Sequence, residues 1–444
     1  MRLYFDYAAS TPVDPLVECA MRPYFLEKFG NAGSLHSFGQ EAMTAIDRSR
    51  ETIAEALGAD FREIIFTGSA TEANNLALRG VIKSFKRRTT GVSRPRLVVS
   101  SIEHEAVLET ARDMEKDGAE VVYVAVNKEG VVDLKKLADA LNERTILVSV
   151  MYANNEIGTI EPMQEVSKLI SEFRKRKIEN RSKKNSKSYF LNSNFYPLFH
   201  TDAVQAFQFL DCNVKKLGVD PHTKRASTPS AADFNNARYG VGVDLLTISA
   251  HKIYGPKGIG ALYVRQETGD KRQGLRGSMS HVAGCLSPIV TGGGQEFGMR
   301  SGTENVPLVV GFAEAVRLLA KSRERDSERI AKLRDFLWRG IKKVFPKAEL
   351  NGPASGSSRL PNILNVCFTG HRSEDLLVKF DLAGLAVSAG SACRGRANRP
   401  SHVISALGYP RERALGSIRF SLGRPTTKKE VDAALKIIKM SLTR

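Results

Sequence analysis

The stretch Ser249-Ala-His-Lys-Ile-Tyr-Gly-Pro-Lys-Gly-Ile-Gly260 lies between two apolar runs, residues 244–249 and 260–265, that read as buried β-strands. It places a serine, a histidine and a lysine in a glycine-rich turn at the end of the first strand. Partial burial lowers the pKa of a lysine amine and makes the amine a nucleophile toward carbonyl groups. We therefore interpret Lys252 as a Schiff-base lysine; the alternative is a surface turn with an ordinary solvated lysine.

A second pattern predicts an anion site at residues 68–71, Gly-Ser-Ala-Thr. An apolar run precedes these small residues, and a helix is expected to begin at them. Backbone N–H groups converge at such a helix start, and the helix dipole adds positive potential, which suits a phosphate group. A plain helix cap, with Glu72 three residues after Ser69, is a compatible interpretation.

Short apolar runs alternate with helical segments from residue 64 to residue 265. This alternation predicts an α/β fold with a mainly parallel sheet. In such sheets the functional site lies beyond the carboxyl ends of the strands. A carboxylate at this edge could bind a protonated pyridine nitrogen. The polar residues expected at the edge are His104, Asn154, Asn155, Asp202 and Gln205.

The sequence after residue 304 predicts a smaller α+β unit. A long helix or helix pair is expected over 304–345, strands near 362–368 and 416–421, and a closing helix over 427–442. Between the strands lies Cys393, surrounded by glycines and small residues and followed by three arginines. An electropositive, mobile loop of this kind favours the thiolate form of the cysteine; the alternative is an incidental loop cysteine.

Composition limits the classes of protein to consider. The 444 residues are 42% hydrophobic and 26% charged, which indicates a globular chain large enough for two domains. Five scattered cysteines without a CxxC pair argue against a disulfide framework or a zinc ribbon. No apolar run is long enough to span a membrane and no targeting segment begins the chain, so we expect no membrane contact and a cytoplasmic location.

The net charge of +18 raises the hypothesis of nucleic-acid binding. Much of the excess lies in two basic runs, residues 82–96 and 174–187, which we interpret as solvated loops. Residues 174–195 as a whole read as a flexible loop. A weak contact of the basic runs with tRNA is kept as an additional hypothesis beside that interpretation.

Taken together, these motifs resemble those of the cysteine desulfurases, the NifS/IscS-like members of the class V aminotransferase family of fold-type I enzymes that use pyridoxal 5'-phosphate. The resemblance covers nearly the whole chain, and the residues that carry it are 4–14, 67–76, 103–104, 154–158, 200–205, 249–258, 298–303, 388–393 and 417–423. It implies an α/β fold with a large domain over 13–310, built on a mainly parallel seven-stranded sheet. Residues 1–12 and 311–444 would form the smaller domain that carries the cysteine loop.

The resemblance also implies roles for individual residues. Lys252 would hold pyridoxal 5'-phosphate as a Schiff base, Asp202 would pair with the pyridine nitrogen, and Gln205 would contact the ring hydroxyl. His104 would stack on the ring and move protons. The other residues expected to bind the cofactor are Ala70, Thr71, Asn155, Ser249, His251 and Thr303. Thr303 would reach the phosphate of a neighbouring subunit, which implies a homodimer.

The implied reaction converts L-cysteine to L-alanine. Arg419, assisted by Asn31, would bind the substrate carboxylate. The thiolate of Cys393 would attack the substrate sulfur and keep it as a persulfide, and a sulfur-acceptor protein, a scaffold for iron–sulfur cluster assembly or a tRNA-thiolation enzyme, would collect it. No metal is expected in this site.

The chain departs from the family pattern in several places. Arg394 and Gly395 follow Cys393, where small hydroxyl residues are usual, and Asn31-Ala-Gly-Ser replaces the common Asn-Pro-Ser-Ser. Loops within 174–198, 216–242 and 266–290 are longer than in most relatives. The sequence also stops at Arg444, so we expect no C-terminal extension of the kind that some relatives use to dock a scaffold.

Two other functions remain open from the sequence. One is another class V enzyme, such as a selenocysteine lyase or an aminotransferase; Cys393 argues against an aminotransferase, which needs no mobile thiol. The other is a basic RNA-associated protein that retains the cofactor residues only as relics of the fold.

Overall fold

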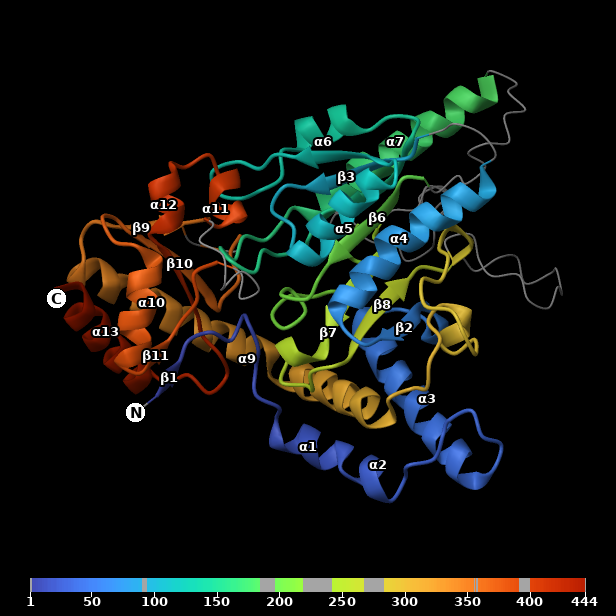
Figure 1. Ribbon diagram of the computed structural model, residues 1–444, viewed down its shortest axis with the longest axis horizontal. Helices are drawn as coiled ribbons and strands as arrows, with labels where there is room; N and C mark the ends of the chain where they lie inside the picture. The colour runs from blue at the N-terminus through green and yellow to red at the C-terminus, as the bar shows by residue number, and fades with distance from the viewer. Residues whose placement is uncertain are drawn as a thin grey trace, which may run out of the picture.

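A computed structural model describes residues 2–89, 94–183, 196–218, 242–266, 283–354, 356, 358–390 and 400–443 (Figure 1). Its largest sheet has seven strands in the order β2-β8-β7-β6-β5-β3-β4. Strand β8 is antiparallel to both of its neighbours, and the other pairs are parallel. The predicted mainly parallel α/β sheet is therefore confirmed. The strands are β2 Ile64–Thr67, β3 Arg96–Ser100, β4 Glu120–Val124, β5 Thr145–Ser149, β6 Leu198–Asp202, β7 Leu245–Ser249 and β8 Gly260–Val264.

Helices cover both faces of this sheet. Apolar side chains alternate between the two faces, so that Ile64 and Phe66 join one buried cluster while Ile65 joins the other. Helices α4 (Ala70–Arg88) and α5 (Glu105–Lys116) complete the cluster around Ile65. The opposite cluster is completed by α3 Ser37–Leu57, α6 Leu134–Ala140, α7 Met163–Lys183 and α9 Val306–Val344.

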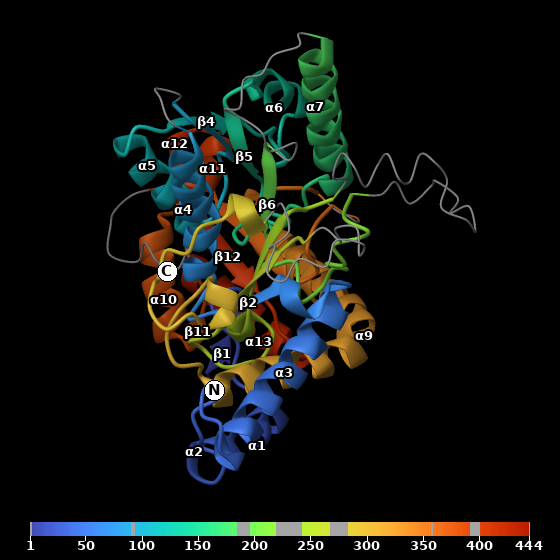
Figure 2. The ribbon, with the colours of Figure 1, turned by 90° about the vertical axis from the view of Figure 1, so that its right-hand side faces the viewer.

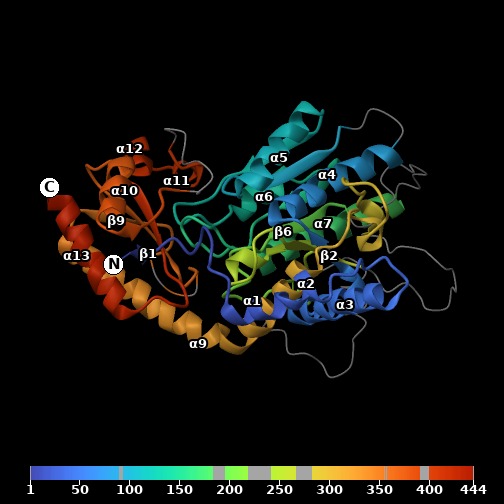
Figure 3. The ribbon, with the colours of Figure 1, turned by 60° about the horizontal axis from the view of Figure 1, so that its bottom comes forward.

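A second, smaller sheet has the antiparallel order β12-β10-β9. It forms the orange and red part of the ribbon, beside the large sheet, and the long helix α9 runs beneath both parts (Figure 3). The predicted α+β unit is thus present, and its boundary at residue 311 stays a prediction because α9 continues through that position. Its elements are β9 Ala348–Asn351, β10 Ile363–Phe368, α10 Ser373–Leu382, β11 Leu385–Ala386, α11 His402–Ala406, α12 Arg411–Leu415, β12 Ser417–Ser421 and α13 Lys428–Thr443.

The N-terminal residues join the two parts. Strand β1 (Leu3–Tyr4) pairs in parallel with β11 in the smaller unit. The chain then crosses to the large sheet, where the backbone N–H of Thr11 donates to the carbonyl of His251 at 3.0 Å. Two short helices follow, α1 Pro15–Met21 and α2 Pro23–Leu26. Among the described residues, each helix is too short or too polar to cross a lipid bilayer.

The interpretation of the basic runs as loops is wrong for part of each run. Residues 82–88 belong to α4, and 174–183 belong to α7, whose upper end projects at the top of Figure 2. Ile82 and Phe85 are buried and hold the end of α4 on the sheet. The parts of the predicted loops at 90–93, 184–195, 219–241 and 267–282 lie outside the described residues.

Arg174 shows why charge alone misled the prediction for α7. Its side chain is only 1% exposed. Its guanidinium donates to the carbonyl of Pro197 and forms an ion pair with Asp244, which also accepts the backbone N–H of Phe199 at 2.7 Å. A residue expected in solvent therefore joins α7 to the start of β6 and β7.

We predict that Arg174→Ala lowers the free energy of unfolding by roughly 3–5 kcal/mol, because the substitution leaves the buried carboxylate of Asp244 without its main partner. Urea denaturation measures the change. Arg176→Ala, on the exposed side of the same helix, is the control and should change stability by no more than about 0.5 kcal/mol. If Arg174→Ala lowers the free energy of unfolding as little as the control does, Arg174 has no structural role.

Candidate active site

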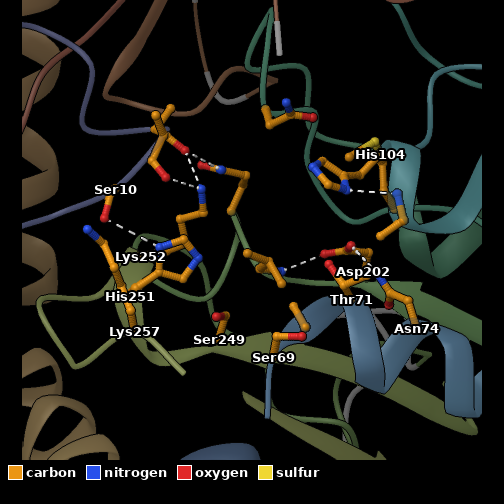
Figure 4. Close-up of a pocket in the computed structure, with 18 of the residues that line it drawn as sticks. Ser10, Ser69, Thr71, Asn74, His104, Asp202, Ser249, His251, Lys252 and Lys257 are labelled. Carbon is orange, nitrogen blue, oxygen red and sulfur yellow. Dashed lines mark hydrogen bonds between the residues drawn. The ribbon is translucent and has the colours of Figure 1, made fainter. Parts of the chain in front are cut away.

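A cavity of about 360 Å³ lies where strands β6 and β7 end and helix α4 begins (Figure 4). Most of the site residues predicted from the sequence line this one cavity although they come from distant parts of the chain. They are Ala70, Thr71, His104, Asn155, Asp202, Gln205, Ser249, His251, Lys252 and Arg419.

The amine of Lys252 projects into the cavity from the turn after β7. Its Nζ donates to the carbonyl oxygens of Ala8 and Ala9, both at 2.7 Å. The carbonyl of Ala8 also accepts the side-chain amide of Gln205 at 3.0 Å. Residues 8–10, for which the sequence predicts no individual role, all line the cavity. The sequence indicated these residues only as part of the motif at residues 4–14.

Asp202 ends strand β6 with its carboxylate in the cavity and 5% of the residue exposed. One oxygen accepts the backbone N–H of Val204 at 3.0 Å, and the other accepts the side-chain amide of Asn74 at 2.8 Å. These two donors fix the position of the carboxylate. Asn74, on α4, also lines the cavity, although the sequence indicated it only as part of the motif at residues 67–76.

The start of α4 forms one end of the cavity. Ser69 caps the helix, since its Oγ accepts the backbone N–H of Glu72 at 3.1 Å, and Thr71 follows in the first turn. Strand β8 passes close beneath: a Cβ at Gly260 would lie 2.8 Å from the backbone nitrogen of Ala70. Lys257 lines the same end. N–H groups at a helix start beside a lysine suit a phosphate.

Two histidines in the cavity are held neutral. Burial lowers the pKa of His104, and the nearby amine of Lys252 lowers it further, while Asp202 opposes the shift. The Nδ1 atom of His104 accepts the backbone N–H of Ala106 at 3.1 Å, so the neutral ring carries its proton on Nε2. Burial, with Lys252 and Lys257, lowers the pKa of His251 to about 4.

Arg419 forms the wall of the cavity nearest the smaller unit. Its Nη1 donates to the carbonyl of Asn155 at 2.9 Å, and its Nη2 pairs with the carboxylate of Asp6 at 2.7 Å. The cavity thus has a lysine and a carboxylate near its centre, N–H groups and a cation at one end, and a buried guanidinium at the other.

Several predicted residues lie elsewhere. Asn31 is exposed and its side chain accepts the backbone N–H of Gly33, so it does not line the cavity. Thr303 is also exposed and outside the cavity. Asn154 is structural, because its side chain donates to the carbonyl of Ile102 and accepts from the following turn. Cys393 lies outside the described residues.

The sequence matches the model of a known protein family. The family model "Aminotransferase class-V" matches residues 3–177 and 236–434. The chain therefore belongs to the class V aminotransferase family.

Within that family the chain belongs with the cysteine desulfurases. It is 42% identical to "Cysteine desulfurase IscS" of Dictyoglomus turgidum, over 98% of this chain and 93% of the relative. A solved structure described as a NifS-like protein covers all of both chains at 33% identity with a TM-score of 0.78. Another, "SspA in complex with cysteine", covers 95% of this chain and 99% of its own at 33% identity, with a TM-score of 0.68.

We predict that His251 titrates near pH 4 in the ligand-free protein. Because its pKa is depressed below the ordinary 6.5, the unfolded chain takes up this proton first. The contribution of His251 to stability is therefore present above pH 6.5 and is lost as the pH falls towards 4. The free energy of unfolding, measured across this pH range, should lose this part of its pH dependence in His251→Gln. An NMR titration that places the pKa of the His251 imidazole near 6.5 would contradict the prediction.

Proposed function

We propose that the protein is a pyridoxal 5'-phosphate-dependent cysteine desulfurase, a sulfurtransferase that converts L-cysteine to L-alanine and keeps the sulfur on Cys393 as a persulfide. The observation that carries the proposal is the meeting of Lys252, Asp202 and His104 in one cavity with an anion site at its end. Full-length similarity to cysteine desulfurases supports the same reaction.

The cavity fits pyridoxal 5'-phosphate. The amine of Lys252 is the group that would bind the aldehyde, and the carboxylate fixed by Asn74 and Val204 would pair with the pyridine nitrogen. Gln205 would meet the ring hydroxyl and His104 the ring face. The phosphate would lie against Ala70, Thr71, Ser249 and His251 at the start of α4. When bound, the cofactor supplies a sink for the electrons released at the substrate Cα.

The protein's own residues would handle the substrate. The buried guanidinium of Arg419 would bind the α-carboxylate of L-cysteine. The amine of Lys252 lies in the cavity as a base for the Cα proton, and neutral His104, with its proton on Nε2, can exchange a proton at that atom. Asn31 would act only by moving, because it lies away from the cavity.

The sulfur transfer oxidises the Cys393 thiolate to a persulfide and reduces the substrate carbon that loses the sulfur. The thiolate of Cys393 attacks the substrate sulfur, an S–S bond forms and the substrate C–S bond breaks. The electron pair of that bond stays on the substrate carbon, which takes a proton and leaves as L-alanine. The persulfide then passes its outer sulfur to an acceptor protein, in iron–sulfur cluster assembly or thiolation pathways. Thr303 would serve the cofactor of a second subunit in a homodimer.

We expect Cys393→Ala to keep the visible absorbance of the bound cofactor and to release no alanine from L-cysteine, since the substrate sulfur then has no acceptor. Alanine release and the mass of the Cys393 peptide after incubation with L-cysteine are the measurements. Cys19→Ala, which removes an exposed free thiol, is the control and should behave as the wild type. Full activity without Cys393 would reject the proposed function.

Lys252→Ala should abolish both turnover and covalent attachment of the cofactor, because no other amine holds the aldehyde at that position. Borohydride reduction followed by peptide mass analysis detects the attachment in the wild type. Attachment at Lys257 instead, the other lysine that lines the cavity, would show that the wrong amine has been assigned.

A further inference from the structure

Arg419 is an almost fully enclosed cation whose direction is set by two contacts. Its side chain is 1% exposed. One terminal nitrogen donates to the carbonyl of Asn155 at 2.9 Å and the other to Asp6 at 2.7 Å, while its Nε has no partner among the described residues. A guanidinium presents its N–H donors in a rigid planar fork. Two contacts on different nitrogens therefore fix where the remaining donors point.

Asp6 reaches Arg419 from the other end of the chain. It follows β1, in the dark-blue segment that crosses between the two parts of the molecule in Figure 1. Its backbone forms a bridge with Ser421, two residues beyond Arg419 on β12, and Tyr7 donates to the carbonyl of Ser421 at 3.2 Å. The carboxylate is therefore presented by backbone that is paired to the same strand as its partner.

A second ion pair joins the same two segments. It serves as a comparison for Asp6, because it balances charge there without lying at the cavity. Asp14 pairs with Arg424 at 2.9 Å, and this pair also joins the N-terminal residues to the end of β12. Neither member lines the cavity, whereas Arg419 and its other partner, Asn155, both do. The contact between Asp6 and Arg419 thus lies directly behind the wall that a ligand would touch.

We propose that Asp6 is a positioning residue for the α-carboxylate of the amino-acid substrate. It holds the guanidinium of Arg419 so that the unoccupied N–H groups face the cavity, and it does not itself touch the substrate. This inference rests on the proposed function, because Arg419 meets a carboxylate only if an amino acid binds there. The site would accordingly distinguish amino acids from amines that lack the carboxylate.

The test compares L-alanine with ethylamine, which is the same molecule without the carboxylate. Binding of each to the cofactor-loaded protein is followed by the change in visible absorbance. In Asp6→Ala we expect the dissociation constant for L-alanine to rise on the order of tenfold, as for loss of a hydrogen bond to a charged group, with that for ethylamine unchanged. Asp6→Asn keeps the acceptor and should restore most of the affinity. Asp14→Ala should leave both constants unchanged.

An unchanged or smaller constant for L-alanine in Asp6→Ala, or an equal rise for ethylamine, overturns the inference. If Asp6→Ala does not fold, Asp6→Glu decides: it keeps the charge but moves the carboxylate, so positioning predicts selective loss of L-alanine binding and charge balance predicts none. Failure of the proposed function is seen separately, in a wild-type protein that binds no cofactor or forms no alanine from L-cysteine.

Discussion

The contact between the amine of Lys252 and the carbonyls of Ala8 and Ala9 is the constraint on which the site depends. It ties the turn after β7 to a segment almost 250 residues earlier, and the same segment supplies the carbonyl that fixes Gln205. Two backbone carbonyl acceptors hold the amine in place. Both of these acceptors are neutral backbone groups, and the amine can leave them to react with a substrate or cofactor carbonyl.

Burial controls charge around that amine. Both histidines of the cavity are kept neutral, His104 by burial and Lys252, and His251 by burial and the two lysines. Among the described residues that line the cavity, the charged groups are the carboxylate of Asp202 and the cations of Lys252, Lys257 and Arg419. A phosphate entering at the start of α4 would then meet lysines and N–H groups rather than a competing imidazolium. The arrangement suits an anionic ligand with a basic ring nitrogen.

The features of the fold and the site that depend on local sequence pattern could be predicted from the sequence. Alternating apolar runs and glycine-rich turns identified the strands of the large sheet and the turn of Lys252, because these signals span only a few residues. The sequence missed Asp6 and Asn74, whose roles arise from contacts across the chain. The prediction of a loop at 174–183 was wrong because a helix can bury an arginine that forms an ion pair with a carboxylate in the core, here Asp244. Charge density alone does not distinguish a solvated run from an ion pair with distant residues.

The turn that carries Lys252 also contains a residue in an unfavourable backbone conformation. Tyr254 has a φ of 67°, a left-handed conformation that costs a bulky residue about 1–3 kcal/mol and persists only where its surroundings determine it. Here Thr11 accepts its backbone N–H at 2.8 Å, and the guanidinium of Arg424 lies 4.2 Å from its ring centroid. Thr11 and Arg424 belong to the two segments that also meet at Arg419. The N-terminal residues thus contact the turn of the lysine through Thr11 and the guanidinium of Arg419 through Asp6, so the two ends of the cavity are positioned together.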